Sequence, residues 1–146
     1  MRRLALLLSV LLASSLLSSD LTAAETKVHA ILITASQEKA PADRRLAPYE
    51  ATLQRNLPES SFRFVGEGTT QVAAKTRSSI NLGSGHRVDL EGGEKDADGI
   101  LIKVRWLNGK VMVMNNSFTF QPGVPIVLGK RSRDDGNVPI VILIAR

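Results

Sequence analysis

The chain lacks cysteine altogether, and aromatic side chains make up only 4% of its 146 residues. Without cysteine the protein cannot form a disulfide framework, a thiolate zinc site or a catalytic cysteine centre. It also cannot carry a lipid on an N-terminal cysteine after signal cleavage. With one Trp, one Tyr and four Phe, the chain has few rings on which nucleic-acid bases could stack, so we expect no nucleic-acid partner.

Repeats and sustained heptads are also missing, which excludes the fibrous classes. What is present is an ordinary globular composition, with 43% hydrophobic and 23% charged residues. That apolar fraction excludes a disordered polar chain. The length fits one domain, because typical domains contain about 100–200 residues.

The first 24 residues have the pattern of a Sec-type signal peptide. Arg2 and Arg3 give a positive start, residues 4–17 are mainly apolar, and residues 22–24 offer small side chains for cleavage. The apolar run is shorter than the roughly 20 residues that a membrane-spanning helix needs. We therefore expect cleavage after Ala24, a periplasmic or secreted protein, and no stable membrane anchor after cleavage. An uncleaved anchor helix is the alternative.

Cleavage would leave a mildly basic domain. The chain has 19 basic and 14 acidic residues, and removal of Arg2, Arg3 and Asp20 leaves 17 and 13, a net charge of +4. Such a charge can aid contact with anionic polymers or membrane surfaces, but ordinary solubility is the favoured explanation.

Two segments of the mature chain are apolar on both alternating faces. They are residues 27–35 and 138–145. Strands of this kind are typical of the centre of a layered fold, where both faces are covered. We expect these first and last strands to pair or to be neighbours.

Residues 44–57 have the apolar spacing of one amphipathic helix. Asp43 is a suitable N-cap, and Pro58 ends the segment. Pro48 falls near the first turn, where a missing N–H does little harm. The apolar positions are Leu46, Tyr49, Leu53 and Leu57.

From Ser60 onward the hydrophobic period changes to two, which predicts strands. Asn108-Gly109 predicts a hairpin, and residues 91–99 a polar loop. Trp106 shares one alternating face with Ile100, Ile102 and Val104, so we expect it in the core. The predicted fold is therefore α+β and mostly β, with residues 25–146 as a single globular domain. One N-terminal amphipathic helix would pack on a mainly antiparallel sheet or sandwich of about eight strands.

Residues 94–99 resemble the start of a calcium loop, but position 12 of that template falls on Arg105, which cannot bind calcium. The segment Gly83-Ser84-Gly85-His86 lacks the helix context of a dinucleotide loop or a nucleophile elbow. We expect His29 to be buried and hydrogen-bonded, and His86 to point outward. The sequence therefore predicts no catalytic residue, no metal and no cofactor.

The densest basic cluster of the mature chain precedes its last strand. It comprises Lys130, Arg131 and Arg133. A loop held between two strands can present charge to a partner. We take these three residues as the candidate partner-binding site, with a solvated hairpin as the alternative.

Four segments together resemble small exported bacterial proteins of unknown function: residues 30–36, 45–49, 61–66 and 123–129. The resemblance covers much of the mature chain and implies no activity. Separately, residues 118–129 are similar to a strand–turn–strand element of outer-membrane secretins, which implies at most a β-hairpin.

The leading functional hypothesis is an exported non-enzymatic domain that acts in protein–protein interaction or in assembly of an envelope complex. Its partner would be an envelope or secreted protein. One alternative is a binding module for an envelope polysaccharide or peptidoglycan, with Trp106 and Tyr49 as the available rings. Another is a small hydrolase with a dispersed site around His29 or His86.

Overall fold

The computed structural model describes residues 25–129 and 136–146. The expected signal peptide and the basic cluster Lys130, Arg131 and Arg133 lie outside these residues. Within the described ranges, no helix has the length and apolar character needed to cross a membrane.

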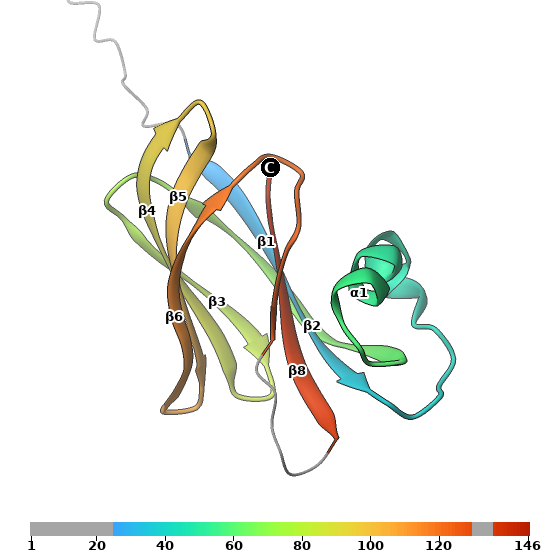
Figure 1. The fold of residues 1–146 in the computed structure, drawn as a ribbon. Coiled ribbons are helices and arrows are strands. Elements are labelled where there is room, and N and C mark those ends of the chain that lie inside the picture. Colours follow the sequence, from blue (N-terminus) through green and yellow to red (C-terminus); the bar gives the residue numbers. More distant parts are fainter. Residues whose placement is uncertain (1–24, 130–135) are drawn as a thin grey trace, which may run out of the picture.

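The described part of the chain is mostly β, with two antiparallel four-stranded sheets and one helical segment (Figure 1). Sheet A has the order β2-β1-β8-β7, and sheet B has the order β3-β4-β5-β6. In Figure 1 sheet A lies between sheet B and the helical segment. The strands are β1 (Thr26–Ser36), β2 (Ser61–Val72), β3 (Arg77–Gly83), β4 (His86–Asp96), β5 (Gly99–Asn108), β6 (Val111–Phe120), β7 (Ile126–Gly129) and β8 (Asn137–Ala145).

The first and last strands are central in sheet A and pair with each other, as predicted. β1 and β8 run antiparallel, with Val28 opposite Ala145 and Ser36 opposite Asn137. Both faces of these strands are buried because sheet B covers one and the helical segment covers part of the other. Their continuous runs of Ile, Leu and Val follow from this position.

The core between the sheets is built from one alternating face of each strand. Trp106 is fully buried here, on the same face of β5 as Ile100, Ile102 and Val104, which confirms the core assignment. Burying such a side chain contributes about 1.5–3 kcal/mol or more from apolar area alone. The opposing buried residues from sheet A are Val28, Ala30, Leu32, Val72, Leu128, Val141, Leu143 and Ala145.

The segment predicted as one helix is a 3-10 helix, η1 (Arg44–Tyr49), followed by an α-helix, α1 (Glu50–Asn56). The prediction of a single helix was wrong because of Pro48. An α-helix from residue 44 would need an N–H at Pro48 that proline lacks, and the ring would clash with the carbonyl four residues earlier. Leu46 and Leu53 are buried against sheet A, in the cluster that contains Ile33 and Ile140.

The predicted polar loop over residues 91–99 was also wrong. β4 continues to Asp96 and β5 begins at Gly99, so only a two-residue turn separates them. These strand ends extend beyond the core, and Glu94, Lys95 and Asp96 are exposed. Alternation of apolar residues therefore fails as a signal here, although the backbone pairing continues to Asp96 opposite Gly99.

The Asn108-Gly109 hairpin is confirmed, with its turn shifted by one residue. Asn108 pairs with Val111, so Gly109 and Lys110 form the two-residue loop. Gly109 has a φ of 60°, which favours glycine at the first loop position of such a turn.

Candidate interaction surface

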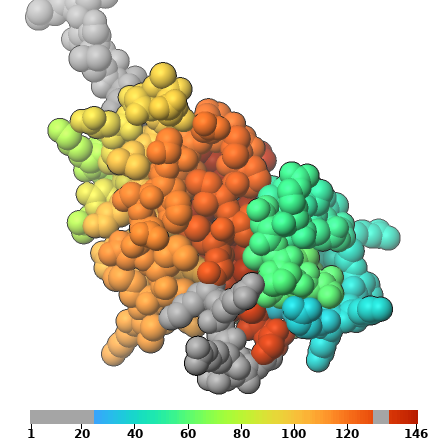
Figure 2. Space-filling model, in the orientation of Figure 1, coloured from blue at the N-terminus to red at the C-terminus, as the bar shows by residue number. Residues whose placement is uncertain are grey.

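The strand β6 forms one edge of sheet B, and within the described residues it pairs only with β5. It has ten residues, VMVMNNSFTF, with no charge and no proline. At its start Val111 is 63% exposed and Met112 is 42% exposed. In Figure 2 this segment and the β7 region, in orange, form surface between the yellow β4–β5 end of sheet B and the helical segment in green.

A β-bulge divides β6 into two parts. Trp106 pairs with Met114 and Leu107 with Met112, so Val113 is the extra residue. From Met114 onward the ladder is regular. Met114, Asn116 and Phe118 lie opposite Trp106, Val104 and Ile102, and therefore share the inter-sheet face.

The inter-sheet face of β6 is covered only in part. Met114 and Phe118 are half-buried against the core, together with Ile126 of β7, whereas Asn116 is exposed. One reason is the shortness of β7, which has four residues against ten in β6. The sandwich is therefore more open on its β6 side than on its other side.

The opposite side of the sandwich is closed by contact between β2 and β3. A Cβ added at Gly66 would collide with the Leu82 carbonyl oxygen, so the two backbones meet directly. Farther along, the Lys75 N–H donates to the Gly92 carbonyl at 2.8 Å, and the Gly92 N–H donates to the Thr76 carbonyl at 3.2 Å. These contacts leave no free strand edge there comparable to β6.

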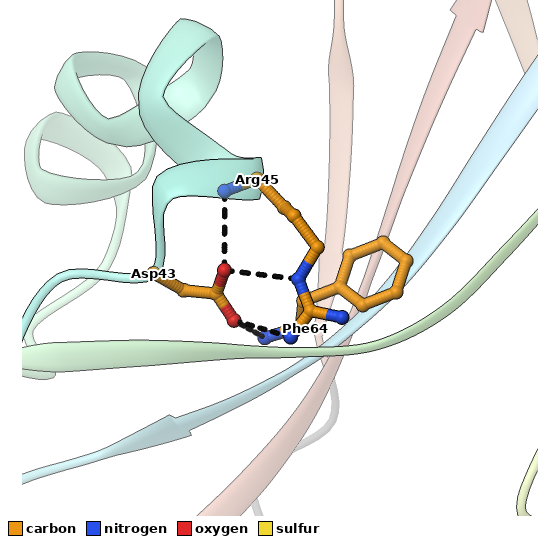
Figure 3. A network of polar contacts seen from close by, with 3 residues as sticks. All are labelled: Asp43, Arg45 and Phe64. Atoms are coloured by element: carbon orange, nitrogen blue, oxygen red, sulfur yellow. Dashed lines mark hydrogen bonds and ion pairs between the residues drawn. The ribbon is translucent and has the colours of Figure 1, made fainter.

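The edge of β2 is also protected, by Asp43 (Figure 3). One carboxylate oxygen accepts from the Phe64 N–H at 3.2 Å and from the Arg45 guanidinium at 2.9 Å. The other accepts from the backbone N–H and the Nε of Arg45, each at 3.1 Å. The Arg45 guanidinium also lies 4.3 Å from the centre of the Phe64 ring. Asp43 thus caps η1, as predicted, and fastens it to sheet A.

The hydrogen bond from the Arg45 side chain lowers the pKa of Asp43 from 3.8 to about 2. Partial burial acts in the opposite direction, and the hydrogen bonds from the two backbone N–H groups lower the pKa further. A carboxyl with a lowered folded-state pKa stabilises the fold above its ordinary pKa and loses that contribution as pH falls through the lowered value. We expect Asp43→Asn to lower Tm at neutral pH, and the difference from wild type to shrink between about pH 4 and pH 2. Thermal melts across this range test it; a difference that stays constant would contradict it.

The environment of His86 is opposite to the one predicted, and that of His29 agrees with its prediction in part. His86 is only 8% exposed, and its Nδ1 accepts a hydrogen bond from Trp106 Nε1 at 3.0 Å. A strand period of two places His86 on the same inward face as Val88 and Leu90, so the outward assignment was wrong. His29 is hydrogen-bonded to Glu67 at 2.8 Å, as expected, but it is half-buried rather than buried.

Burial lowers the pKa of His86 below 6.5. The fold therefore favours the neutral imidazole, and its stabilisation is complete above the ordinary pKa and declines as pH falls below it. We expect Tm to fall between about pH 7 and pH 5, and His86→Gln to flatten that slope while its amide still accepts from Trp106. The control Leu101→Ala, which removes an exposed side chain without a titratable group, should keep the slope. An unchanged slope in His86→Gln would contradict the assignment.

The largest of the cavities described here lies where the 36–43 connection crosses β2. Its volume is about 320 Å³, and Asp43, Arg63 and Asn137 are among its lining residues. The Asp43 carboxylate already accepts four hydrogen bonds from Arg45 and Phe64, so its role there is structural. Of the five cavities measured among the described residues, none is lined by His29 or His86.

The calcium-like segment is the end of β4 and a hairpin turn, not a binding loop. The Asp96 carboxylate accepts from the Asp98 N–H at 2.8 Å and so stabilises the turn. Across residues 25–129 and 136–146, no group of three or more His, Asp or Glu side chains is placed to hold a metal ion.

Comparison of the chain with protein-family models, with curated proteins and with solved structures finds no match.

Sequence reasoning identified β6 as a return strand but not as an interaction site. Its interior carries neither charge nor proline over ten residues, and that signal was available in the sequence. The sequence did not indicate where β6 lies within its sheet. Only the order of sheet B makes β6 an edge.

Proposed function

We propose that the chain is an exported, non-enzymatic protein that binds another polypeptide by adding a strand of it to the edge of β6. The observation that carries the proposal is the absence of charge and proline along this edge. Edge strands usually carry lysine, proline, inward charges or a β-bulge that prevent unwanted pairing. Apart from the bulge at Val113, the ten residues of β6 carry none of these, and their apolar start is exposed.

Strand addition supplies both affinity and selectivity. The unpaired backbone groups of an edge strand hydrogen-bond to an extended polypeptide, and alternate side chains provide selectivity. A polysaccharide is a poorer ligand for this surface. The only Trp, Trp106, is fully buried, and Tyr49 is partly buried against sheet A, so neither ring offers an open platform.

Site-specific photo-crosslinking in cells that express the full chain tests the proposal. The crosslinking residue replaces Asn115, which is exposed on the outer face of β6, or Gln54 on α1 as the control. We expect Asn115 to link to one contiguous polypeptide segment, and Ser117→Lys in the same chain to abolish that link because edge charge opposes pairing. Equal links from Gln54, links only to glycan, or links that survive Ser117→Lys would contradict it.

A further inference from the structure

We infer that the strand accepted by β6 is β6 of a second copy, paired antiparallel about a two-fold axis at Asn116. This inference rests on the proposed function, because it names the occupant of the same edge. The product would be one continuous eight-stranded sheet, in which the two copies of sheet B join edge to edge.

The side-chain pattern of β6 is self-complementary about Asn116. In this register Met114 lies opposite Phe118 of the second copy, and the same pair recurs on the other side of the axis. Asn115 then lies opposite Ser117. Directly opposite residues of an antiparallel pair share one face, and Met114 and Phe118 do share the inter-sheet face. Apolar side chains thus meet apolar ones, sulfur meets an aromatic ring, and small polar side chains meet each other.

Charge also favours a second copy as the occupant. After the expected cleavage the chain carries 17 basic and 13 acidic residues, a formal charge of +4, so contact between two copies is generally repulsive. β6 is a ten-residue stretch without any charged side chain, so two copies can meet there with no like charges directly opposite. Selection of a foreign strand by charge would need charged residues on this edge, and β6 has none.

The bulge at Val113 limits the contact. Regular pairing about Asn116 covers residues 114–118 in each copy, which makes a short ladder. We therefore expect a dimer whose population depends on protein concentration, rather than a permanent one. Beyond the bulge, Val111 and Met112 remain exposed.

Analytical ultracentrifugation of the purified, exported protein tests the inference, because it compares the wild-type dimer with variants that carry a charge at residue 116, on the two-fold axis. Asn116 is exposed, so Asn116→Asp and Asn116→Lys should each retain the circular-dichroism spectrum and Tm of the wild type. Each variant places like charges opposite each other and should raise the dissociation constant of the dimer by about two- to fivefold relative to wild type. An equimolar mixture of the two should restore the dimer, because opposite charges then meet across the axis.

The other outcomes separate the inference from the proposed function. A wild-type protein that stays monomeric at the highest concentration, while Asn115 still crosslinks to a foreign segment, overturns self-pairing and leaves strand addition standing. A dimer that is insensitive to both substitutions, or one that the mixture does not restore, also overturns the inference. A monomer without any crosslink from Asn115 overturns both.

Discussion

Trp106→Ala is expected to lower the free energy of unfolding by about 3–5 kcal/mol, the range for truncating a large buried aromatic side chain. Trp106 is 0% exposed and lies in the inter-sheet core, where few neighbours can close the space that its ring would leave. The substitution also removes the N–H that donates to His86 Nδ1, so a buried acceptor loses its partner. Urea unfolding followed by circular dichroism measures the loss without needing tryptophan fluorescence.

Two further variants separate packing from hydrogen bonding at this site. Trp106→Phe retains an aromatic ring but cannot donate to His86, and should lose less stability than Trp106→Ala. Leu101→Ala is the control on the same strand, because Leu101 is 45% exposed on the opposite face. Its loss should stay below about 1 kcal/mol. A loss of similar size in Trp106→Ala would contradict the described core.

Gly66→Ala is expected to destabilise the fold by about 3 kcal/mol, the upper part of the range for overpacked sites. An added Cβ would collide with the Leu82 carbonyl oxygen, and backbone cannot rotate away as a side chain can. β2 and β3 would have to separate, which opens the closed side of the sandwich.

Gly68→Ala provides the matched control for this contact. Its added Cβ would meet the Ile80 Cγ2 methyl group, so relief requires this buried, β-branched side chain to change rotamer but does not require two backbones to separate. We expect a clearly smaller loss in urea unfolding than for Gly66→Ala. Equal losses at the two positions would contradict a direct backbone contact between β2 and β3.

The layered arrangement could be predicted from the sequence because strands that are buried on both faces consist almost entirely of apolar residues. Residues 27–35 and 138–145 are apolar on both faces, and their strands are central in sheet A. Trp106 was placed in the core by the alternation of its strand, and the structure confirms this. In both cases, the pattern of apolar residues that indicates burial lies within one short segment of the sequence.

Features that depend on distant residues could not be predicted in this way. The pairing of β4 with β5 continues through polar residues to Asp96, beyond any apolar alternation. His29 lies at a part of β1 where its side chain is only half covered, so its apolar neighbours in sequence were misleading. The exposure of β6 likewise depends on the short β7 and on the strand order of sheet B.

Backbone hydrogen–deuterium exchange of the exported protein, over a roughly hundredfold range of concentration, tests the central claim most directly. If β6 accepts β6 of a second copy, the amides among residues 114–118 that face away from β5 should exchange more slowly as concentration rises. The amides of β1 and of residues 140–143 in β8, where both sides of the strand are paired, should be protected at every concentration and thereby report an intact fold. Exchange in residues 114–118 that does not change with concentration, while β1 and β8 stay protected, would contradict the account.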